Sequence, residues 1–191
     1  MREPRQEIVL IRHGETEWSL SGQHTGRTDI PLTEHGRSQA QRLAEQLSDR
    51  SFALVLTSPL VRAAETCRLA GLSAHALERP ELMEWHYGAY EGRTTLDIRS
   101  ERPGWTIWAD GVPDGETAVE VSARVDRVLD ELRAVKGDAA LVGHGHVLRV
   151  LAARWLGLGP EAGRLFALDP ASVSVLGHER ETPVLLGWNR R

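Results

Sequence analysis

The chain has 191 residues, of which 41% are hydrophobic and 26% are charged. This length and composition predict one globular domain over residues 1–191 with a substantial core. The formal net charge is −4, so the overall charge gives no general attraction to nucleic acid or to an anionic membrane. Any site for an anion must therefore be local.

Two features of the composition indicate the compartment. Cys67 is the only cysteine, which excludes an intrachain disulfide and fits a reducing environment. Residues 1–7 are polar, and no run approaches the ~18–20 apolar residues of a membrane span. We therefore expect a cytoplasmic protein without a signal peptide or a membrane span. Lys136 is the only lysine, so nearly every permanent cation is a guanidinium, whose planar fork suits phosphate and carboxylate.

Apolar runs and helical stripes of apolar residues alternate along the chain. In chain order they predict a buried strand at 8–11, a loop-like stretch at 19–32, a helix capped by Thr33, a strand at 52–56, a helix at 59–70, a short strand at 74–79, an irregular segment at 80–116 with a helix at 94–101, a helix at 117–135, a strand at 139–142, a helix at 147–156, and closing strands at 172–177 and 183–188. This alternation predicts an α/β fold with a largely parallel sheet.

The helix at 59–70 has sequence signals at both ends. Ser58 has the residue type of an N-cap, Pro59 would take the first helical position, and Gly71 falls where a glycine ends many helices. This places Arg62 in the first turn, on the side of the sheet where the preceding strand ends. The irregular segment 80–116 contains aromatic residues that favour a packed segment, either covering the sheet or shaping a site: Trp85, Tyr87, Tyr90, Trp105 and Trp108.

Two strands end in the same short pattern. His13 and Gly14 follow the strand at 8–11, and His144 and Gly145 follow the strand at 139–142. Glycine allows a sharp turn or the close approach of a ligand. Because parallel strands end at the same edge of a sheet, both histidines would emerge there. If the strands are neighbours, the two imidazoles face one crevice, and Arg12 and Arg62 converge on it.

Two histidines and two arginines at one edge suit a phosphoryl group that is held and attacked. Arginine forks bind phosphoryl oxygens, and an imidazole nitrogen can act as the nucleophile. Nearby guanidinium charges would keep His13 neutral, as attack requires. A general acid must then protonate the leaving alkoxide. Glu81, Glu84 and Glu91 are the local candidates, and their spacing alone does not choose between them.

Metal binding is the rival chemical interpretation, because His144 and His146 form an H-x-H pattern. No group of Asp, Glu and His at a suitable spacing completes a set of ligands, so we expect no metal and regard His146 as a packing residue or one that supports the site. Five other histidines are predicted to lie mostly at the surface: His24, His35, His75, His86 and His178. Of these, His24 follows the first motif closely enough to line the pocket.

Six segments of the chain resemble, in order, those of the histidine phosphatase superfamily, in the branch of cofactor-dependent phosphoglycerate mutases. They are LIRHGETEW (10–18), TGRTDIPLT (25–33), TSPLVRA (57–63), EWHYGAYEG (84–92), GE (115–116) and GHG (143–145). The resemblance spans about residues 7–178, and the ordered set is far more specific than any single piece. It implies a three-layer αβα sandwich with a mainly parallel central sheet and chemistry that needs no metal or other cofactor.

The resemblance also implies roles for individual residues. His13 would be the phosphorylated nucleophile and Glu84 the proton donor, while Arg12, Arg62 and His144 would hold the phosphate. Eight further residues are expected to bind substrate: Ser19, His24, Thr25, Gly26, Ser58, Tyr87, Gly145 and Arg149. Among these, Thr25 and Ser58 are expected to bond the phosphate. Arg149, placed in the first turn of the helix after His144, would reach a distal phosphate or a sugar hydroxyl.

The family contains both phosphatases and mutases, and the residues after Tyr87 bear on the choice. Mutases of the family carry a lysine and paired arginines there, whereas this chain has only the separated Arg93, Arg99 and Arg102. Ser19 also stands where mutases usually have asparagine. The segment 84–116 looks more like the sedoheptulose-bisphosphatase-type and broad acid phosphatases.

We therefore expect a phosphomonoesterase acting on a small phosphorylated metabolite, such as a sugar phosphate or bisphosphate. A phosphoglycerate mutase is the alternative, and a non-catalytic module that binds phosphate or a phosphopeptide is a remote one. The expected partner is a small-molecule phosphate ester, with no nucleic acid and no membrane. The resemblance also suggests a homodimer.

Overall fold

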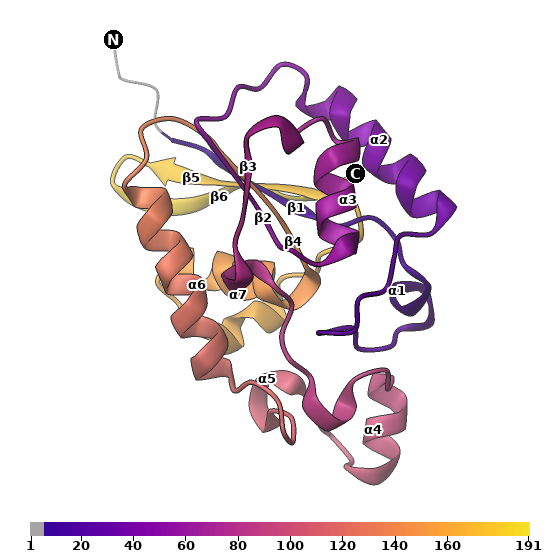
Figure 1. Cartoon of the computed structure of the whole chain (residues 1–191). Coiled ribbons are helices and arrows are strands. Elements are labelled where there is room, and N and C mark those ends of the chain that lie inside the picture. The colour runs from indigo at the N-terminus through magenta and orange to yellow at the C-terminus, as the bar shows by residue number, and fades with distance from the viewer. Residues whose placement is uncertain (1–5) are drawn as a thin grey trace.

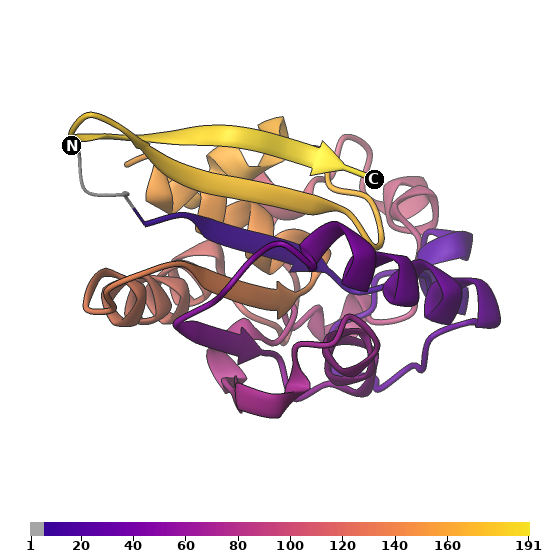
Figure 2. The ribbon, with the colours of Figure 1, turned by 90° about the horizontal axis from the view of Figure 1, so that it is seen from above.

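The computed structural model describes residues 6–191 and is built around one six-stranded sheet (Figure 1). The strand order is β3-β2-β4-β1-β5-β6, and Figure 2 shows the strands side by side in this order. The first four strands along this order are parallel, whereas β5 and β6 are antiparallel. The strands are β1 (Ile8–Arg12), β2 (Leu54–Thr57), β3 (Ala76–Glu78), β4 (Ala139–Gly143), β5 (Val173–Glu179) and β6 (Thr182–Arg190). The predicted parallel α/β sheet with two closing strands is confirmed.

Helices cover both faces of the sheet and make the predicted three-layer sandwich. They are α1 (Glu17–Ser21), α2 (Glu34–Leu47), α3 (Val61–Leu69), α4 (Thr95–Glu101), α5 (Ile107–Asp110), α6 (Ala118–Arg133) and α7 (Gly145–Trp155), with short 3-10 turns at Ser73–His75, Pro80–Leu82, Gly88–Tyr90 and Pro160–Leu165. Apolar residues of α6 and α7 pack in one cluster with one face of the sheet, and those of α2 and α3 pack with the other face.

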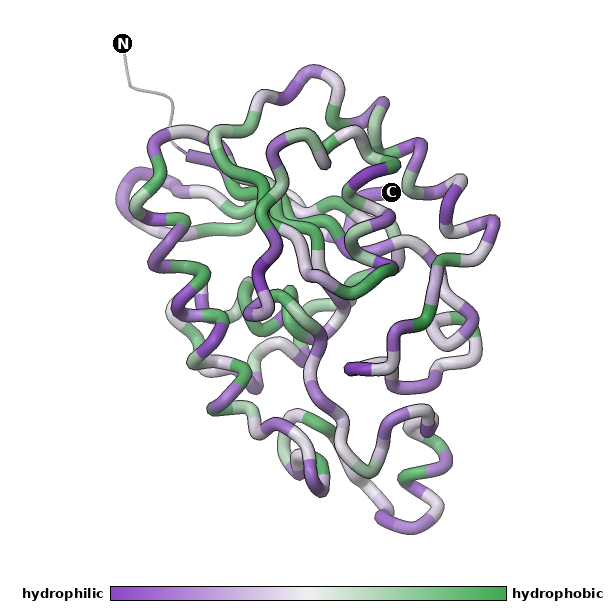
Figure 3. Tube along the Cα trace, viewed as in Figure 1, coloured by the Kyte–Doolittle hydropathy of each residue, from purple (hydrophilic) through white to green (hydrophobic). Residues whose placement is uncertain are grey.

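The two clusters follow from the alternation of side chains along a buried strand. Ile8 and Leu10 of β1 pack with α6 and α7, whereas Val9 and Ile11 pack with α2 and α3. All four residues are fully buried. Figure 3 shows the hydrophobic residues concentrated along the central strands. The apolar runs of the sequence therefore mark strands that are covered on both faces.

The start of α3 differs from the prediction. The helix begins at Val61, its cap residue is Leu60, and no side chain caps it, so Ser58 is not an N-cap and Pro59 is not helical. The Ser58 hydroxyl accepts from the N–H of Leu60 at 3.3 Å and lies 2.8 Å from Nε2 of His144. A tertiary contact to His144 therefore occupies the hydroxyl that local signals assign to capping. Gly71 lies one residue beyond the cap at φ 75°, as predicted.

The stretch 19–32 is not entirely a loop, because α1 reaches Ser21. Thr16 and Ser19 cap this short helix reciprocally: Oγ1 of Thr16 accepts from the N–H of Ser19 at 3.1 Å, and Oγ of Ser19 accepts from the N–H of Thr16 at 2.9 Å. Gly22, at φ 76°, ends the helix in a left-handed conformation. Serine in place of the usual Glu or Gln at the third position hides this cap from sequence patterns.

Segment 80–116 is a packed cover, as its aromatic residues predict. Trp85 is fully buried and Trp105 is 2% exposed, and both belong to the cluster that contains α6 and α7. The two short helices of the segment, α4 and α5, lie together beyond the sheet (Figure 1). The segment therefore supplies both core contacts and one wall of the site described next.

Candidate active site

Three parallel strands end together at the site. β2, β4 and β1 are neighbours, with Arg12 of β1 opposite Gly143 of β4. The backbone N–H of His13 donates to the carbonyl of Gly143 at 3.0 Å, which continues the ladder one residue beyond the strand. The rings of His13 and His144 have centroids 5.1 Å apart. The two histidine–glycine patterns therefore meet at one edge of the sheet, as predicted.

Gly14 is required by close packing of two backbones. A Cβ at this position would lie 2.4 Å from the carbonyl oxygen of Gly36, in the first turn of α2. A Cβ on Gly36 would in turn lie 2.1 Å from the carbonyl oxygen of Glu15. The sequence suggested a sharp turn or an approaching ligand at Gly14, but the neighbour is the backbone of α2. This contact fixes the loop that follows His13.

The environment of His13 keeps its ring neutral and fixes its tautomer. The side chain is 5% exposed, and burial, followed by the charges of Arg62 and Arg12, holds its pKa well below the ordinary value of 6.5. Nδ1 lies 2.7 Å from the carbonyl oxygen of Gly14, so Nδ1 carries the proton and donates it there. The lone pair is therefore on Nε2, the nitrogen available for attack on a substrate.

Arg62 and His144 form a buried layer behind His13. Both are fully buried, and Nε of Arg62 donates to Nδ1 of His144 at 3.1 Å. Nε2 of His144 therefore carries the proton and donates to Oγ of Ser58 at 2.8 Å. Burial and then the charge of Arg62 lower the pKa of His144 well below 6.5. This ring is thus neutral, with both nitrogens engaged by protein groups.

Arg62 also binds the loop at residues 25–28. Its Nη1 donates to the carbonyl of Thr28 at 3.0 Å, and its Nη2 donates to those of Thr25 at 3.2 Å and Gly26 at 2.9 Å. Three backbone carbonyls and one imidazole are therefore satisfied by a single guanidinium. Burial lowers the pKa of Arg62. The negative charge of Glu84 acts in the opposite direction and is the largest of the influences that raise this pKa.

Arg12 has a buried nitrogen without a partner. Its Nη1 donates to the carbonyl of Leu168, but Nε is buried and finds no acceptor among residues 6–191. The guanidinium lies against Gly145 at the start of α7, where a Cβ would make an ordinary van der Waals contact with Cζ of Arg12 at 3.4 Å. Buried polar groups are normally paired, so the orphaned Nε indicates an acceptor supplied by a ligand.

Glu84 lies at the amino end of α7. Its carboxylate accepts three backbone N–H groups: those of Trp85 and Val147 on Oε1 and that of His146 on Oε2, all at 2.9 Å. The residue is 4% exposed. The other two candidate acids do not line the pocket. Glu81 pairs with Arg127 at 3.5 Å, and Glu91 binds the loop at residues 25–28.

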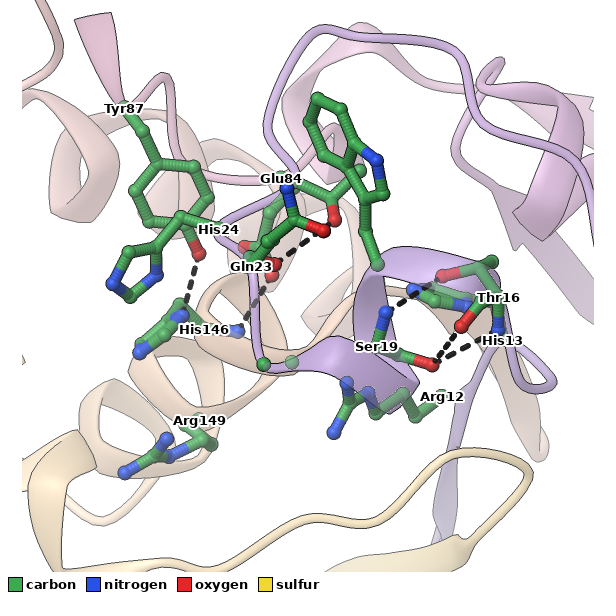
Figure 4. Close-up of a pocket in the computed structure, with 14 residues that line it drawn as sticks. Arg12, His13, Thr16, Ser19, Gln23, His24, Glu84, Tyr87, His146 and Arg149 are labelled. Carbon is green, nitrogen blue, oxygen red and sulfur yellow. Dashed lines mark hydrogen bonds between the residues drawn. The ribbon is translucent and has the colours of Figure 1, made fainter. Parts of the chain in front are cut away.

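Arg12, His13 and Glu84 line a pocket of about 190 Å³ (Figure 4). Nine of the thirteen predicted site residues line it: Arg12, His13, Ser19, His24, Thr25, Glu84, Tyr87, Gly145 and Arg149. Four lie outside the lining: Gly26, Ser58, Arg62 and His144. Five lining residues were not among the predicted site residues: Thr16, Trp18, Gly22, Gln23 and His146.

Nearly all of the described chain matches one family. The model of the histidine phosphatase superfamily, branch 1, matches residues 8–191. An acid phosphatase of Mycobacterium tuberculosis is 38% identical over 178 residues, covering 90% of this chain and 86% of its own. A sedoheptulose 1,7-bisphosphatase of Saccharomyces cerevisiae is 35% identical over 79% of this chain and 68% of its own.

The chain belongs to the histidine phosphatase superfamily, branch 1. A solved structure of an open reading frame product of Mycobacterium tuberculosis has a TM-score of 0.93 at 36% identity, and the match covers 98% of both chains. A protein of Proteus mirabilis named probable phosphoglycerate mutase is 31% identical over 95% of this chain and 89% of its own. The expected family, fold and enzyme class, a phosphoric monoester hydrolase, are thus confirmed.

Some hydroxyls of this histidine phosphatase are already occupied by its own backbone. Oγ of Ser19 donates to the carbonyl of Thr16 at 2.8 Å, and Oγ1 of Thr25 donates to that of Gln23 at 3.2 Å. The hydroxyl of Tyr87 lies 2.6 Å from Nδ1 of His146. His146 therefore shapes the pocket, although the sequence marked it only as a packing or supporting residue. The only sequence pattern that marked His146 was the H-x-H pair with His144, which is typical of a metal site.

Arg149 lies in the second turn of α7, because the helix begins at Gly145 and not at Val147 as predicted. Its guanidinium stacks over the ring of Trp108, with Cζ 4.7 Å from the centroid. Within residues 6–191, no group of three or more His, Cys, Asp and Glu is placed to hold a metal ion. In the same part of the chain, no helix is both long enough and apolar enough to cross a membrane.

The buried histidines make stability depend on pH. The pKa values of His13, His144 and His146 are all lowered well below 6.5, chiefly by burial. Below pH 6.5 the unfolded chain binds protons that the native rings do not, so the free energy of unfolding falls as pH falls. Each ring contributes up to ~1.4 kcal/mol per pH unit in this window.

Denaturant unfolding at pH 7.5, 6.5 and 5.5 measures this effect. The carboxyl groups with lowered pKa values have ordinary values of 3.8 to 4.5 and therefore titrate below the window. His35→Gln, at an exposed position of α2, is the control and should leave the slope unchanged. A free energy of unfolding that stays constant from pH 7.5 to 5.5 would contradict the prediction.

Proposed function

We propose that this chain hydrolyses small phosphorylated metabolites, such as sugar phosphates or bisphosphates, through a phosphohistidine formed on His13. The observation that carries the proposal is the state of His13. Its Nδ1 is bound to the carbonyl of Gly14, which leaves Nε2 unprotonated, and the side chains of His13 and Arg12 line the same pocket. A neutral nucleophile beside an unpaired cationic donor suits an anionic, electrophilic phosphoryl group.

The reaction proceeds in two balanced steps. In the first, Nε2 of His13 forms a bond to phosphorus, the P–O bond of the ester breaks, and the leaving oxygen takes a proton from Glu84. In the second, water attacks phosphorus, the N–P bond returns its electron pair to Nε2, and the Glu84 carboxylate takes the proton of the water. Glu84 has to enter the cycle protonated. Its carboxyl group lines the pocket together with His13.

The phosphate is held from two levels. Arg12 supplies guanidinium donors at the pocket surface, beside Gly145 at the start of α7, whereas Arg62 and His144 act from the layer behind His13. This proposal keeps all five catalytic residues predicted from the sequence but gives Arg62 and His144 a mainly positioning role. Of the predicted binding residues, Ser19, His24, Thr25, Tyr87 and Gly145 are proposed to contact the substrate directly. Gly26 and Ser58 then support Arg62 and His144.

A mutase activity is the alternative that the family allows. It is supported by the similarity to the Proteus mirabilis protein. Segment 93–114 of this chain contains no lysine and no adjacent pair of arginines, which favours hydrolysis. The alternative predicts that a coupled assay with phosphoglycerates detects phosphoryl transfer between positions faster than the release of inorganic phosphate.

A phosphate-release panel tests the proposed function. Sugar monophosphates, sugar bisphosphates, phosphoglycerates and an aryl phosphate are compared, with a metal chelator present throughout. We expect turnover of at least the sugar esters with the chelator present. Protein that binds phosphate but releases none from any ester would overturn the proposal in favour of a binding module.

The role of Glu84 predicts a dependence on the leaving group. An alkoxide needs a proton from the acid, whereas a nitrophenolate leaves without one. Glu84→Gln is therefore expected to lower kcat for a sugar phosphate by ~10²–10⁴-fold and to affect nitrophenyl phosphate far less.

Glu81→Gln is the matched control for Glu84→Gln, because Glu81 lies three residues away and pairs with Arg127 outside the pocket. The control should hydrolyse both esters at the wild-type rate. If Glu84→Gln lowered kcat equally for both esters, Glu84 would not be the general acid.

Three expectations from the sequence remain predictions of this proposal. We propose that residues 1–191 act as one domain, of which residues 1–5 lie outside the described part. Light scattering after gel filtration tests the homodimer, and cell fractionation tests the cytoplasmic location. A small-molecule phosphate ester is the partner that the proposed chemistry requires.

A further inference from the structure

Arg124 is a buried arginine of α6 that the proposed reaction does not use. The residue is 6% exposed and lies outside the lining of the active-site pocket. A buried guanidinium is unfavourable unless protein groups match both its charge and its donors. The partners of Arg124 therefore indicate what this charge does in the interior.

The fork of Arg124 is fully used. A guanidinium has five N–H donors, and Arg124 makes five hydrogen bonds within the described chain. Nε and Nη2 donate to Oε1 and Oε2 of Glu116 at 2.8 and 3.0 Å. Nη1 donates to the backbone carbonyls of Glu81 and Met83, the latter at 2.7 Å, and Nη2 donates to that of Glu84 at 3.2 Å. One side chain thus binds a carboxylate and the backbone that leads to Glu84.

Glu116 binds the backbone on the other side of Glu84. Its Oε2 accepts from the N–H of His86 at 2.8 Å, and its own N–H donates to the carbonyl of His86 at 2.9 Å. The carbonyl of Glu116 accepts from Nε1 of Trp85 at 2.7 Å. The chain before Glu84 is therefore held by Arg124, and the chain after it is held by Glu116, which Arg124 binds in turn.

The carboxylate of Glu84 is held by different groups. It accepts the N–H groups of Trp85, His146 and Val147, and the last two belong to the first turn of α7. The bond from Arg124 goes to the backbone carbonyl of Glu84, so Arg124 fixes the backbone of this residue and leaves its carboxylate to the pocket. A shift of that backbone would move the carboxylate relative to α7.

We propose that Arg124 is a positioning residue for the general acid: it fixes the backbone of residues 81–84 so that the carboxylate of Glu84 meets the leaving oxygen. This inference rests on the proposed function, in which Glu84 is the acid. Proton transfer requires hydrogen-bond distance, and a misplacement of about 1 Å can lower a rate by ~10²-fold. Attack by His13 on an ester with a stable leaving anion does not require the acid. A loosened Arg124 should therefore slow mainly the esters whose leaving group needs a proton.

Arg124→Lys separates the fork from the charge. An ammonium keeps the positive charge beside Glu116, but it has three donors and no planar fork, so it cannot bind the carboxylate and three carbonyls together. The readout is kcat for a sugar phosphate divided by kcat for nitrophenyl phosphate. We expect Arg124→Lys to lower this ratio by roughly 10- to 100-fold. A wild-type ratio, with kcat for both esters either unchanged or lowered equally, would overturn the proposal.

Glu116→Gln loosens the same fork and leaves Arg124 in place. The amide oxygen can still accept from the N–H of His86, but the charge that pairs with the guanidinium is lost. The ratio should fall in the same direction as in Arg124→Lys. This variant gives a second measurement that does not depend on the folding of Arg124→Lys, and a wild-type ratio in it would count against the proposal in the same way.

Arg154→Lys is the matched control. Arg154 of α7 makes a similar ion pair, in which Nε and Nη2 donate to the carboxylate of Asp126 at 2.9 and 3.0 Å, and it does not line the pocket. Its replacement weakens a contact between α6 and α7 without releasing residues 81–84. The ratio should stay at the wild-type value while the free energy of unfolding falls. A ratio that falls as far as in Arg124→Lys would indicate a general loss of packing and overturn the proposal.

The double variant Glu84→Gln/Arg124→Lys tests whether Arg124 acts through Glu84. Once the acid is removed, there is no proton donor left to position, so adding Arg124→Lys should lower kcat for the sugar phosphate little further. Residues that act through one another are non-additive in this way. Losses that multiply in full would mean that Arg124 influences catalysis by another route.

Amide hydrogen exchange separates this inference from the proposed function, because it needs no turnover. The N–H of Val147 donates to the carboxylate of Glu84, whereas that of Leu148 donates to a backbone carbonyl at the cap of α7. Relative to Leu148, exchange at Val147 should be roughly 10-fold faster in Arg124→Lys, the lower end for losing a hydrogen bond to a charged group. In Arg154→Lys this relative rate should be unchanged.

The exchange result and the activity result can fail independently. Faster relative exchange at Val147 in a protein that hydrolyses no ester would show that Arg124 positions Glu84 even though the proposed function is wrong. Unchanged exchange in Arg124→Lys would overturn the positioning role even in an active phosphatase.

Discussion

The His13→Ala variant is expected to lose phosphate release by roughly 10⁴- to 10⁶-fold, the loss seen when an enzyme nucleophile is removed. The reason is that the covalent route needs Nε2 of His13, which the bond from Nδ1 to Gly14 leaves unprotonated. Two neighbouring imidazoles are already hydrogen-bonded within the protein. His144 has both nitrogens engaged, and Nδ1 of His146 is bound to Tyr87. Steady-state phosphate release from a sugar phosphate measures the loss.

The covalent adduct provides a second readout for His13. Wild-type protein mixed with a ³²P-labelled ester and quenched in alkali should carry one acid-labile phosphoryl group per chain, and His13→Ala should carry none. His35→Ala, at an exposed position, is the control for loss of a histidine and should be labelled normally. An active wild-type enzyme that never acquires the adduct would remove His13 from the nucleophile role.

The sequence predicts the sheet and its active edge because both depend on local patterns. Apolar runs such as Ile8–Ile11 mark strands buried on both faces, and their alternation with helices requires parallel crossovers. The repeated histidine–glycine pair then places His13 and His144 at one edge without any knowledge of side-chain conformations. Glycine at position 14 was recognised as special, but its neighbour, the backbone of Gly36, is a tertiary contact that no local pattern contains.

The layering of the site could not be predicted from the sequence. Spacing places Arg62 and His144 near the phosphate, but only coordinates show that they bind each other and lie behind the pocket surface. Ser58 illustrates the reason, since the same residue type can cap a helix or accept from a distant imidazole.

Arg62→Ala is expected to damage both activity and stability. Removing the guanidinium leaves three backbone carbonyls and Nδ1 of His144 without their donor in a buried region. Each unsatisfied group costs about 1–3 kcal/mol when water cannot reach it, so we expect a loss of at least about 3 kcal/mol in the free energy of unfolding. Loss of the ordered His144 and of the positive charge near His13 should lower kcat by ~10²–10³-fold.

Arg62→Lys separates the charge of Arg62 from its geometry. An ammonium keeps the positive charge but cannot bond four acceptors arranged around a planar fork. If positioning dominates, Arg62→Lys should resemble Arg62→Ala in kcat, measured at a temperature where both variants are folded. Wild-type kcat in Arg62→Lys would show instead that charge alone is required.

Glu91 binds the same loop as Arg62, at residues 25–28, but through N–H groups where Arg62 binds carbonyls. Arg62 binds carbonyls of the loop, while Oε1 of Glu91 accepts the N–H groups of Gly26 at 2.8 Å and Thr28 at 3.0 Å. Gly26 has no room for a side chain, since a Cβ would lie 2.6 Å from the backbone carbonyl oxygen of Trp85 and 2.6 Å from Oε2 of Glu91. Two residues that order one loop should not act independently.

A double-mutant cycle of Arg62→Lys and Glu91→Gln tests this coupling. Because the first substitution already releases the loop, the second should cost less in its presence, with an interaction energy of about 0.5–3 kcal/mol. The cycle is measured both on the free energy of unfolding and on kcat, since a purely structural contact would couple only in the first. Additive effects on both quantities would mean that Glu91 holds the loop without influencing Arg62, and the positioning of His144 would then depend on Arg62 alone.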